Sequence, residues 1–148
     1  GGIGGAVPEI EPERNMAAYR ALTAAMGKEL VASAHDCSDG GLAVALAECC
    51  FGSDSGAAID ITPIWSDCDH LDTWGALFGE SLGRILVSTS PDNKKAFEKS
   101  MEGVTCHYIG EVSEGDEISF SREDDVILSA SMKVLRESWK GTLHGGGA

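Results

Sequence analysis

Residues 31–48 read VASAHDCSDGGLAVALAE, and this stretch decides how the first half of the chain folds. Short apolar runs stand on both sides of a polar loop that holds two aspartates and two glycines. The run before the loop is short enough for a strand, whereas the run after it is apolar on nearly every side, which is typical of a buried helix. The pattern predicts a strand over residues 30–34, a loop, and a helix that begins near Gly40.

The loop carries negative charge with no basic residue close to it in the sequence. Asp36 and Asp39 lie at the predicted helix start, while the nearest lysine or arginine is Lys28 upstream and Arg84 downstream. Such an acidic pair either caps the helix or forms half of a metal site. In the capping interpretation Asp39 or the neighbouring serine is the N-cap, worth roughly 1 kcal/mol, and Asp36 makes an Asx-turn. Spacing alone favours capping, and for Asp39 we keep that prediction.

The metal interpretation makes the loop a phosphate site. A helix start offers unsatisfied N–H groups and a positive dipole, and Gly40 and Gly41 let another group approach the backbone. Carboxylates would repel a phosphate there unless Mg²⁺ bridged the two. Asp36 would then bind the ion and the Ser38 hydroxyl would donate to phosphate, although the loop lacks the lysine of a P-loop.

Composition limits the class of protein. The 148 residues suit one domain with a core, since 43% of them are hydrophobic. The 24 acidic and 11 basic residues give a net charge of −13, which disfavours nucleic acid and anionic membranes as partners. Five cysteines without a CxxC spacing, and no recognisable secretion signal, predict a reduced, cytoplasmic protein.

The ends of the sequence differ from its middle. GGIGGAVPEIEP, residues 1–12, is rich in glycine and proline and is predicted to be a lead-in from a preceding domain. Residues 13–141 are predicted to form the domain itself, and the glycine-rich residues 142–148 a flexible tail. We therefore expect the chain to be a C-terminal piece of a longer polypeptide.

The first predicted helix runs from residue 13 to about Gly27. Met16, Tyr19, Leu22 and Met26 recur in it at three- and four-residue steps, which predicts one apolar face.

The rest of the chain alternates between helix and strand patterns. Asp72 is predicted to cap a short helix, and Ser90-Pro91 to open another helix with Phe97 and Met101 on one face. Further strands are predicted at residues 57–61, 84–89, 106–112, 117–120 and 126–131, and a last helix at 131–141. The order predicts an α/β (α+β) fold with helices against a mixed sheet.

The run SAHDCSDGGLAVALAE resembles the signature of the C-terminal ATP-binding-type domain of the phosphoribosylformylglycinamidine synthase (PurL) family. AAYRALTAAMGKEL resembles the helix before that signature and GAAIDI the strand after it. LFGESLGRILVS and LRESWKG resemble later segments, so the likeness extends from about Val7 to Gly141.

The resemblance implies a three-layer α/β/α domain, like the PurM C-terminal domain and partly ferredoxin-like. It implies an ATP-dependent ligase of purine biosynthesis, which converts formylglycinamide ribonucleotide (FGAR) and glutamine-derived ammonia to the amidine (FGAM). The cofactors would be ATP or ADP with Mg²⁺, and the partners the preceding domains, a glutaminase subunit (PurQ) and a bridging subunit (PurS). On the family pattern Asp36 binds magnesium and Ser38 contacts nucleotide phosphate, with Gly40 and Gly41 beside them. The family keeps its catalytic histidine in earlier domains, so these residues alone are expected to be inactive.

Two alternatives stay open. One is another ATP user of the same superfamily, such as aminoimidazole ribonucleotide synthetase or selenophosphate synthetase. The other is a non-catalytic scaffolding half that is kept for packing between domains. Within the ligase interpretation, the resemblance also implies that in long single-chain synthetases this half holds an auxiliary nucleotide, so Asp36 would then serve a structural nucleotide site.

Other candidate residues have ordinary interpretations. His35 is predicted to be satisfied by backbone groups, and Cys37 to be a partly buried, inert thiol. A zinc set drawn from the segments at 68–70 and 106–107 lacks the usual spacing and is not favoured.

Overall fold

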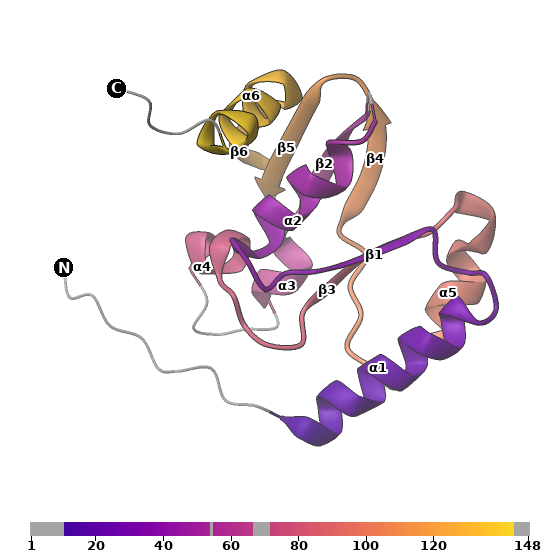
Figure 1. Cartoon of the computed structure of the whole chain (residues 1–148). Coiled ribbons are helices and arrows are strands. Elements are labelled where there is room, and N and C mark those ends of the chain that lie inside the picture. Colours follow the sequence, from indigo (N-terminus) through magenta and orange to yellow (C-terminus); the bar gives the residue numbers. More distant parts are fainter. Residues whose placement is uncertain (1–10, 54, 67–71, 144–148) are drawn as a thin grey trace. The chain divides into compact units, whose positions relative to one another are not determined.

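The computed structural model describes residues 11–53, 55–66 and 72–143 of the chain (Figure 1). The chain forms two compact units, and it crosses from one to the other three times. The first unit comprises Gly1–Asp39 and Glu80–Cys106, and the second comprises Gly40–Gly79 and His107–Ala148. Residues 1–10 of the predicted lead-in and residues 144–148 of the predicted tail lie outside the described residues, so these boundaries remain predictions.

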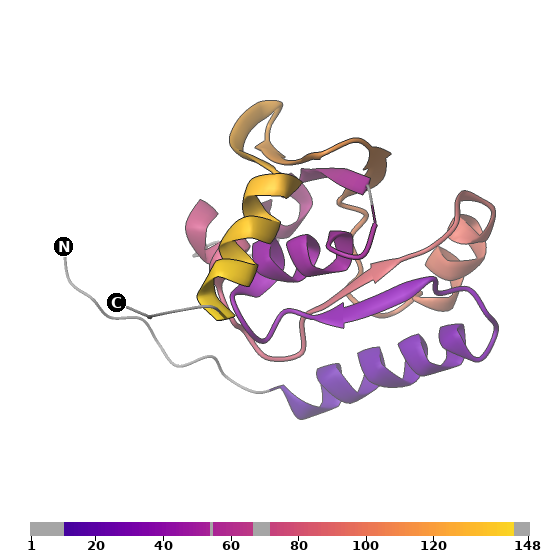
Figure 2. The same cartoon turned by 45° about the horizontal axis from the view of Figure 1, so that its top comes forward.

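The first unit packs two helical segments against a two-stranded sheet. Its elements are α1 (Pro12–Met26), β1 (Ser33–Asp36), β3 (Ile85–Ser88), the 3-10 turn η1 (Pro91–Asn93) and α5 (Lys94–Ser100). Strands β1 and β3 pair antiparallel, with Ser33 opposite Ser88 and Asp36 opposite Ile85, and they run side by side in Figure 2. Leu22, Ala25, Phe97 and Met101 form the core between α1 and α5.

The predicted apolar face of α1 is wrong at three of its four positions. Met16, Tyr19 and Met26 are 46%, 39% and 44% exposed, and only Leu22 is buried. The buried side runs instead through Leu22 and Ala25, because Ala25 is small enough for the helix to pack closely on α5 there.

The predicted strand at 30–34 is observed later, at Ser33–Asp36. Leu30 lies after the turn that ends α1, where its N–H group donates back to the carbonyl oxygen of Ala25 at 3.1 Å. Ala32 is the first residue to bond across to β3, donating to Ser88 at 2.9 Å. The strand therefore extends to the first aspartate of the loop.

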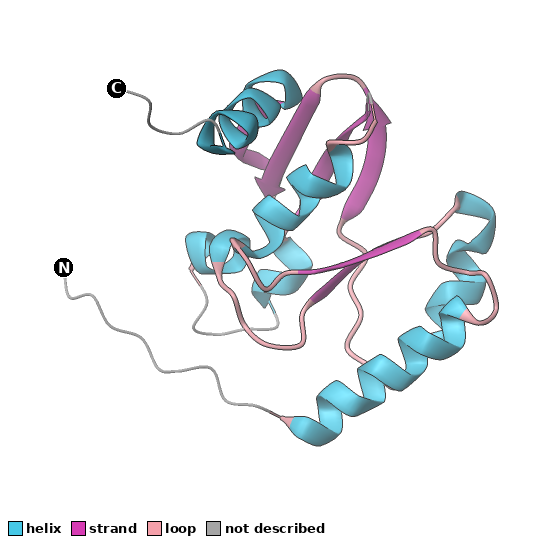
Figure 3. Cartoon of the chain, viewed as in Figure 1, coloured by secondary structure: helices cyan, strands magenta, loops and turns pink. Residues whose placement is uncertain are grey.

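The second unit holds a four-stranded mixed sheet with helices, as predicted (Figure 3). Its elements are α2 (Gly41–Cys50), β2 (Ser55–Asp60), α3 (Thr62–Ser66), α4 (Thr73–Phe78), β4 (Gly110–Glu114), β5 (Glu117–Arg122), β6 (Asp125–Ser131) and α6 (Met132–Leu143). The strand order is β4-β2-β5-β6, with β2 and β5 parallel and the other neighbours antiparallel.

Several local predictions are confirmed. Helix α2 buries seven of its ten residues. Asp72 caps α4 by accepting a hydrogen bond from the Gly75 N–H group at 2.6 Å. Ser90 accepts one from Asn93 at 3.3 Å at the start of η1. None of the described helices is both long and apolar enough to cross a membrane.

Candidate functional site

The DCSDGG loop is divided between the two units, with residues 36–39 in the first and the glycines in the second. Asp36 ends β1, and its side chain is 69% exposed. The pKa of its carboxyl group is lowered, first by a hydrogen bond from the Ser38 hydroxyl and then by one from its own backbone N–H group. The electrostatic interaction with His35 and the Ser38 N–H group lower it further. Asp36 is thus ionised at neutral pH and presents a carboxylate to solvent.

The same hydrogen bonds fit the Asx-turn that the capping interpretation predicts for Asp36. A carboxylate that accepts the N–H group two residues ahead makes such a turn, and Ser38 supplies that group. Because the side chain is nevertheless exposed, the turn orients the carboxylate without burying it.

His35 contacts backbone, as predicted. Its Nδ1 atom lies 2.6 Å from the carbonyl oxygen of Asp36 and 3.9 Å from that residue's Oδ1. A carbonyl oxygen only accepts hydrogen bonds, so Nδ1 carries the proton and donates it. This contact fixes the ring at the strand end and gives His35 no role as a general base at Nδ1.

Cys37 is the buried residue of the loop, at 2% exposure. Burial raises the pKa of its thiol, and the positive charge of Arg84 lowers it by less. Burial of this residue is thus confirmed, and the raised pKa supports the prediction of an inert thiol, because it keeps the group protonated at neutral pH.

The fold supplies the loop with a cation that the sequence spacing hides. The N–H group of Cys37 donates to the carbonyl oxygen of Arg84 at 3.1 Å, one step beyond the β1–β3 ladder. No basic residue is close to the loop in the sequence, yet the fold places Arg84 beside Cys37. An antiparallel pair brings together residues that are 47 positions apart in the chain.

Gly40 and Gly41 begin the second unit, and both have left-handed backbone conformations, with φ of 71° and 70°. A Cβ atom on Gly40 would lie 2.4 Å from a methyl carbon of Val44. A Cβ atom on Gly41 would lie 2.7 Å from the Leu77 carbonyl oxygen and 2.7 Å from the Phe78 carbonyl carbon. Conformation and packing thus both require glycine here, whatever else the turn does.

The predicted cap of α2 is wrong. The N-cap residue is Gly40, and none of the described side chains makes a capping hydrogen bond there. The two left-handed glycines shift the helix start beyond Asp39, so neither that carboxylate nor the Ser38 hydroxyl occupies the cap position. Asp39 is exposed to solvent instead.

The metal-ligating residues that the structure describes are sparse. Across residues 11–53, 55–66 and 72–143, no group of three or more histidine, cysteine, aspartate or glutamate residues could hold an ion. Asp36 would therefore give one carboxylate to a magnesium ion, which suits an ion that usually takes one or two carboxylates, phosphate oxygens and water. Cys68 and His70 of the disfavoured zinc set lie outside the described residues.

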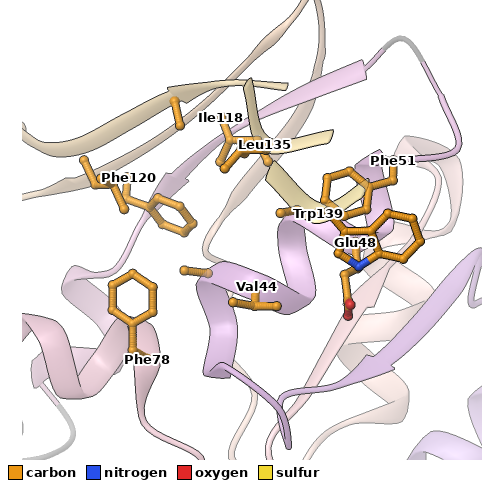
Figure 4. A pocket seen from close by; sticks show the side chains of 12 residues that line it. Val44, Glu48, Phe51, Phe78, Ile118, Phe120, Leu135 and Trp139 are labelled. Atoms are coloured by element: carbon orange, nitrogen blue, oxygen red, sulfur yellow. The ribbon is translucent and has the colours of Figure 1, made fainter. Parts of the chain in front are cut away.

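Sequence reasoning missed an apolar cavity in the second unit. It has a volume of about 330 Å³ and is lined by residues from α2, α4, β5, β6 and α6 (Figure 4). No single segment of the sequence signals it, because the lining residues come from separate parts of the chain.

The family model for "AIR synthase related protein, C-terminal domain" matches residues 2–123, and the chain belongs to this family. Strand β6 and helix α6 follow the matched segment.

Three solved structures from Thermotoga maritima are similar in fold. The structure of PurLQS has a TM-score of 0.79 at 20% identity, and the match covers 88% of this chain and 23% of that chain. PurL complexed with FGAR has a TM-score of 0.76 at 20% identity, and the match covers 87% of this chain and 22% of that chain. PurL complexed with ATP has a TM-score of 0.73 at 21% identity, and the match covers 80% of this chain and 21% of that chain. The chain thus spans less than a quarter of these chains, and the likeness establishes the PurM C-terminal-like fold.

Proposed function

We propose that this chain is the C-terminal domain of a phosphoribosylformylglycinamidine synthase, with residues 13–141 as the domain and an ATP-binding domain before it. The whole enzyme would convert FGAR and ammonia to FGAM with ATP in the cytoplasm. The observation that carries the proposal is an exposed, ionised Asp36 followed by a glycine turn, in a chain of this family.

The loop would bind the phosphates of ATP or ADP. Asp36 holds a magnesium ion, the Ser38 hydroxyl donates to a phosphate oxygen, and Gly40 and Gly41 leave the start of α2 without a side chain in the way. The exposed carboxylate fits a ligand for a hard cation, and the missing side-chain cap fits an anion at the helix start. Magnesium, when bound, neutralises phosphate charge.

The partners follow from the same proposal. Ammonia would reach the enzyme from a glutaminase subunit, PurQ, with PurS as the bridging subunit. A solved structure of similar fold is a PurLQS assembly, which supports this set of partners. Because the family keeps its catalytic histidine elsewhere, we expect the 148 residues alone to release no ADP when supplied with FGAR, ATP and ammonia.

A scaffolding role is the second candidate, and two observations favour it. Packing against Val44 and Phe78 accounts for both glycines without a ligand. Hydrogen bonds within the loop account for the orientation of Asp36. In this alternative the loop is a structural turn and no nucleotide binds to it.

Calorimetry with ADP, in the presence and absence of magnesium, separates the two roles. We expect Asp36→Asn to weaken Mg²⁺-dependent ADP binding by about tenfold or more, because the amide keeps the hydrogen bonds but loses the charge. Asp39→Ala is the matched control, since Asp39 is an exposed carboxylate of the same loop that caps nothing. Equal affinity in the wild type and in Asp36→Asn would favour the scaffold.

A further inference from the structure

The apolar cavity lies wholly within the second unit. Helices α2 and α6 and strands β5 and β6 provide most of its walls, and Phe78 from the end of α4 closes one side (Figure 4). The lining residues are Ala43, Val44, Ala47, Glu48, Phe51, Phe78, Ile118, Phe120, Leu128, Ala130, Leu135 and Trp139. Its volume is about 330 Å³, and it opens to solvent, because Phe78 and Trp139 in its lining are 44% and 49% exposed.

The walls of the cavity offer water few hydrogen-bonding partners. Eleven of its twelve lining side chains are apolar, and Glu48 is the exception. Figure 4 shows the Glu48 carboxylate directed away from Ile118 and Leu135. An ordered water needs two to four polar partners, which these walls do not provide, so an apolar occupant is favoured over solvent.

Aromatic rings define the shape of the space. Phe51 and Trp139 form a tilted pair with ring centroids 5.4 Å apart at one end. Phe120, at 3% exposure, and Ile118, at 2%, form the floor, while Phe78 is 44% exposed at the rim. Rings at such angles favour a further ring packed against a face or an edge.

The charge of the chain and the size of the cavity restrict the class of ligand further. None of the lining residues is basic, and the chain has a net charge of −13, so anionic ligands are repelled. The same charge opposes the insertion of a second copy of the chain. The volume lies at the small end of ligand pockets, which run from roughly 300 to 1,000 Å³.

We infer that this cavity is a binding site for an uncharged aromatic molecule of one or two rings. The site shares no residue with the DCSDGG loop, so it does not depend on the proposed ligase function. Two of its residues, Val44 and Phe78, also pack against the turn at Gly40 and Gly41. A bound ligand would therefore contact the residues that hold the start of α2.

The test uses two fluorescent probes with the same rings on the full chain. N-phenylnaphthylamine is uncharged, and anilinonaphthalene sulfonate adds one negative charge. We expect the uncharged probe to bind saturably, one per chain, with a Kd on the order of tens of micromolar, and the sulfonate to bind about tenfold more weakly.

Filling the cavity should abolish this binding. Ala47→Leu on α2 and Ala130→Leu on β6 project side chains into the space, and each should weaken binding of the uncharged probe by about tenfold. Ala58→Leu is the control, because Ala58 is an exposed residue of β2 outside the lining. Thermal melting of each variant checks its folding.

Three results would overturn the inference. They are non-saturable binding of the uncharged probe, equal binding of the sulfonate, and wild-type binding by both well-folded filling variants. Sedimentation adds a fourth. A wild-type dimer that both filling variants turn into monomers would show that a second copy occupies the cavity.

Discussion

The turn at Gly41 offers the sharpest test of how the second unit is built. Gly41→Ala places a Cβ atom 2.7 Å from two backbone atoms of α4, which cannot rotate away as a side chain can. The left-handed conformation costs an alanine about 1–2 kcal/mol, and overpacking adds about 1–3 kcal/mol. The expected loss of about 2–5 kcal/mol is a large fraction of a typical domain's stability.

Two glycine controls separate the contributions. Gly103 has φ of 83° and nothing within 4 Å of its Cβ position, so Gly103→Ala should show the conformational cost alone. Gly52 has neither a positive φ nor a close neighbour, so Gly52→Ala should change stability little. Thermal denaturation followed by circular dichroism should show a Tm for Gly41→Ala that is lower by roughly 5–15 °C, about twice the shift at Gly103. A Gly41→Ala protein that melts with the wild type would refute this explanation of the glycine turn.

Two further predictions concern single hydrogen-bonding groups. Asp72→Ala removes the cap of α4 and should lower the free energy of unfolding, measured by chemical denaturation, by about 1 kcal/mol. Asp72→Asn keeps a capping oxygen and should retain most of that stability. Equal losses of stability in the two variants would argue against capping. The pKa of Asp36 lies below its ordinary value of 3.8, so this group favours the folded state above that value and loses its contribution as the pH falls through the folded-state pKa. Ser38→Ala should raise the Asp36 pKa toward 3.8 in a carboxyl NMR titration, since the Ser38 hydroxyl is the largest cause of the shift; an unmoved titration would contradict this.

Local signals in the sequence predicted local structure well. The cap at Asp72, the Ser90-Pro91 opening and the buried helix after the loop depend on residues within one or two turns of each other, and all three are observed. The family resemblance also gave the fold class correctly, because its motifs extend over most of the chain.

The failures have a common physical cause, which is that they depend on contacts between distant segments or on backbone conformation. The basic neighbour of Cys37 comes from a strand pair 47 residues away. Met16 and Met26 are exposed because α5 packs on the alanine side of α1. Asp39 misses the cap position because two glycines adopt left-handed conformations after it. The cavity is formed by five separate elements, and no single segment carries its pattern.

The central claim is that Asp36 holds a divalent cation against a nucleotide phosphate. The most direct measurement replaces Mg²⁺ by paramagnetic Mn²⁺ in the presence of ADP and follows the backbone amide signals of the labelled protein. We expect the signals of Asp36, Ser38 and Gly40 to broaden first, and Asp36→Asn to abolish that broadening. Broadening that centres on another acidic segment, or that is the same without ADP and in Asp36→Asn, would contradict a nucleotide site in this loop.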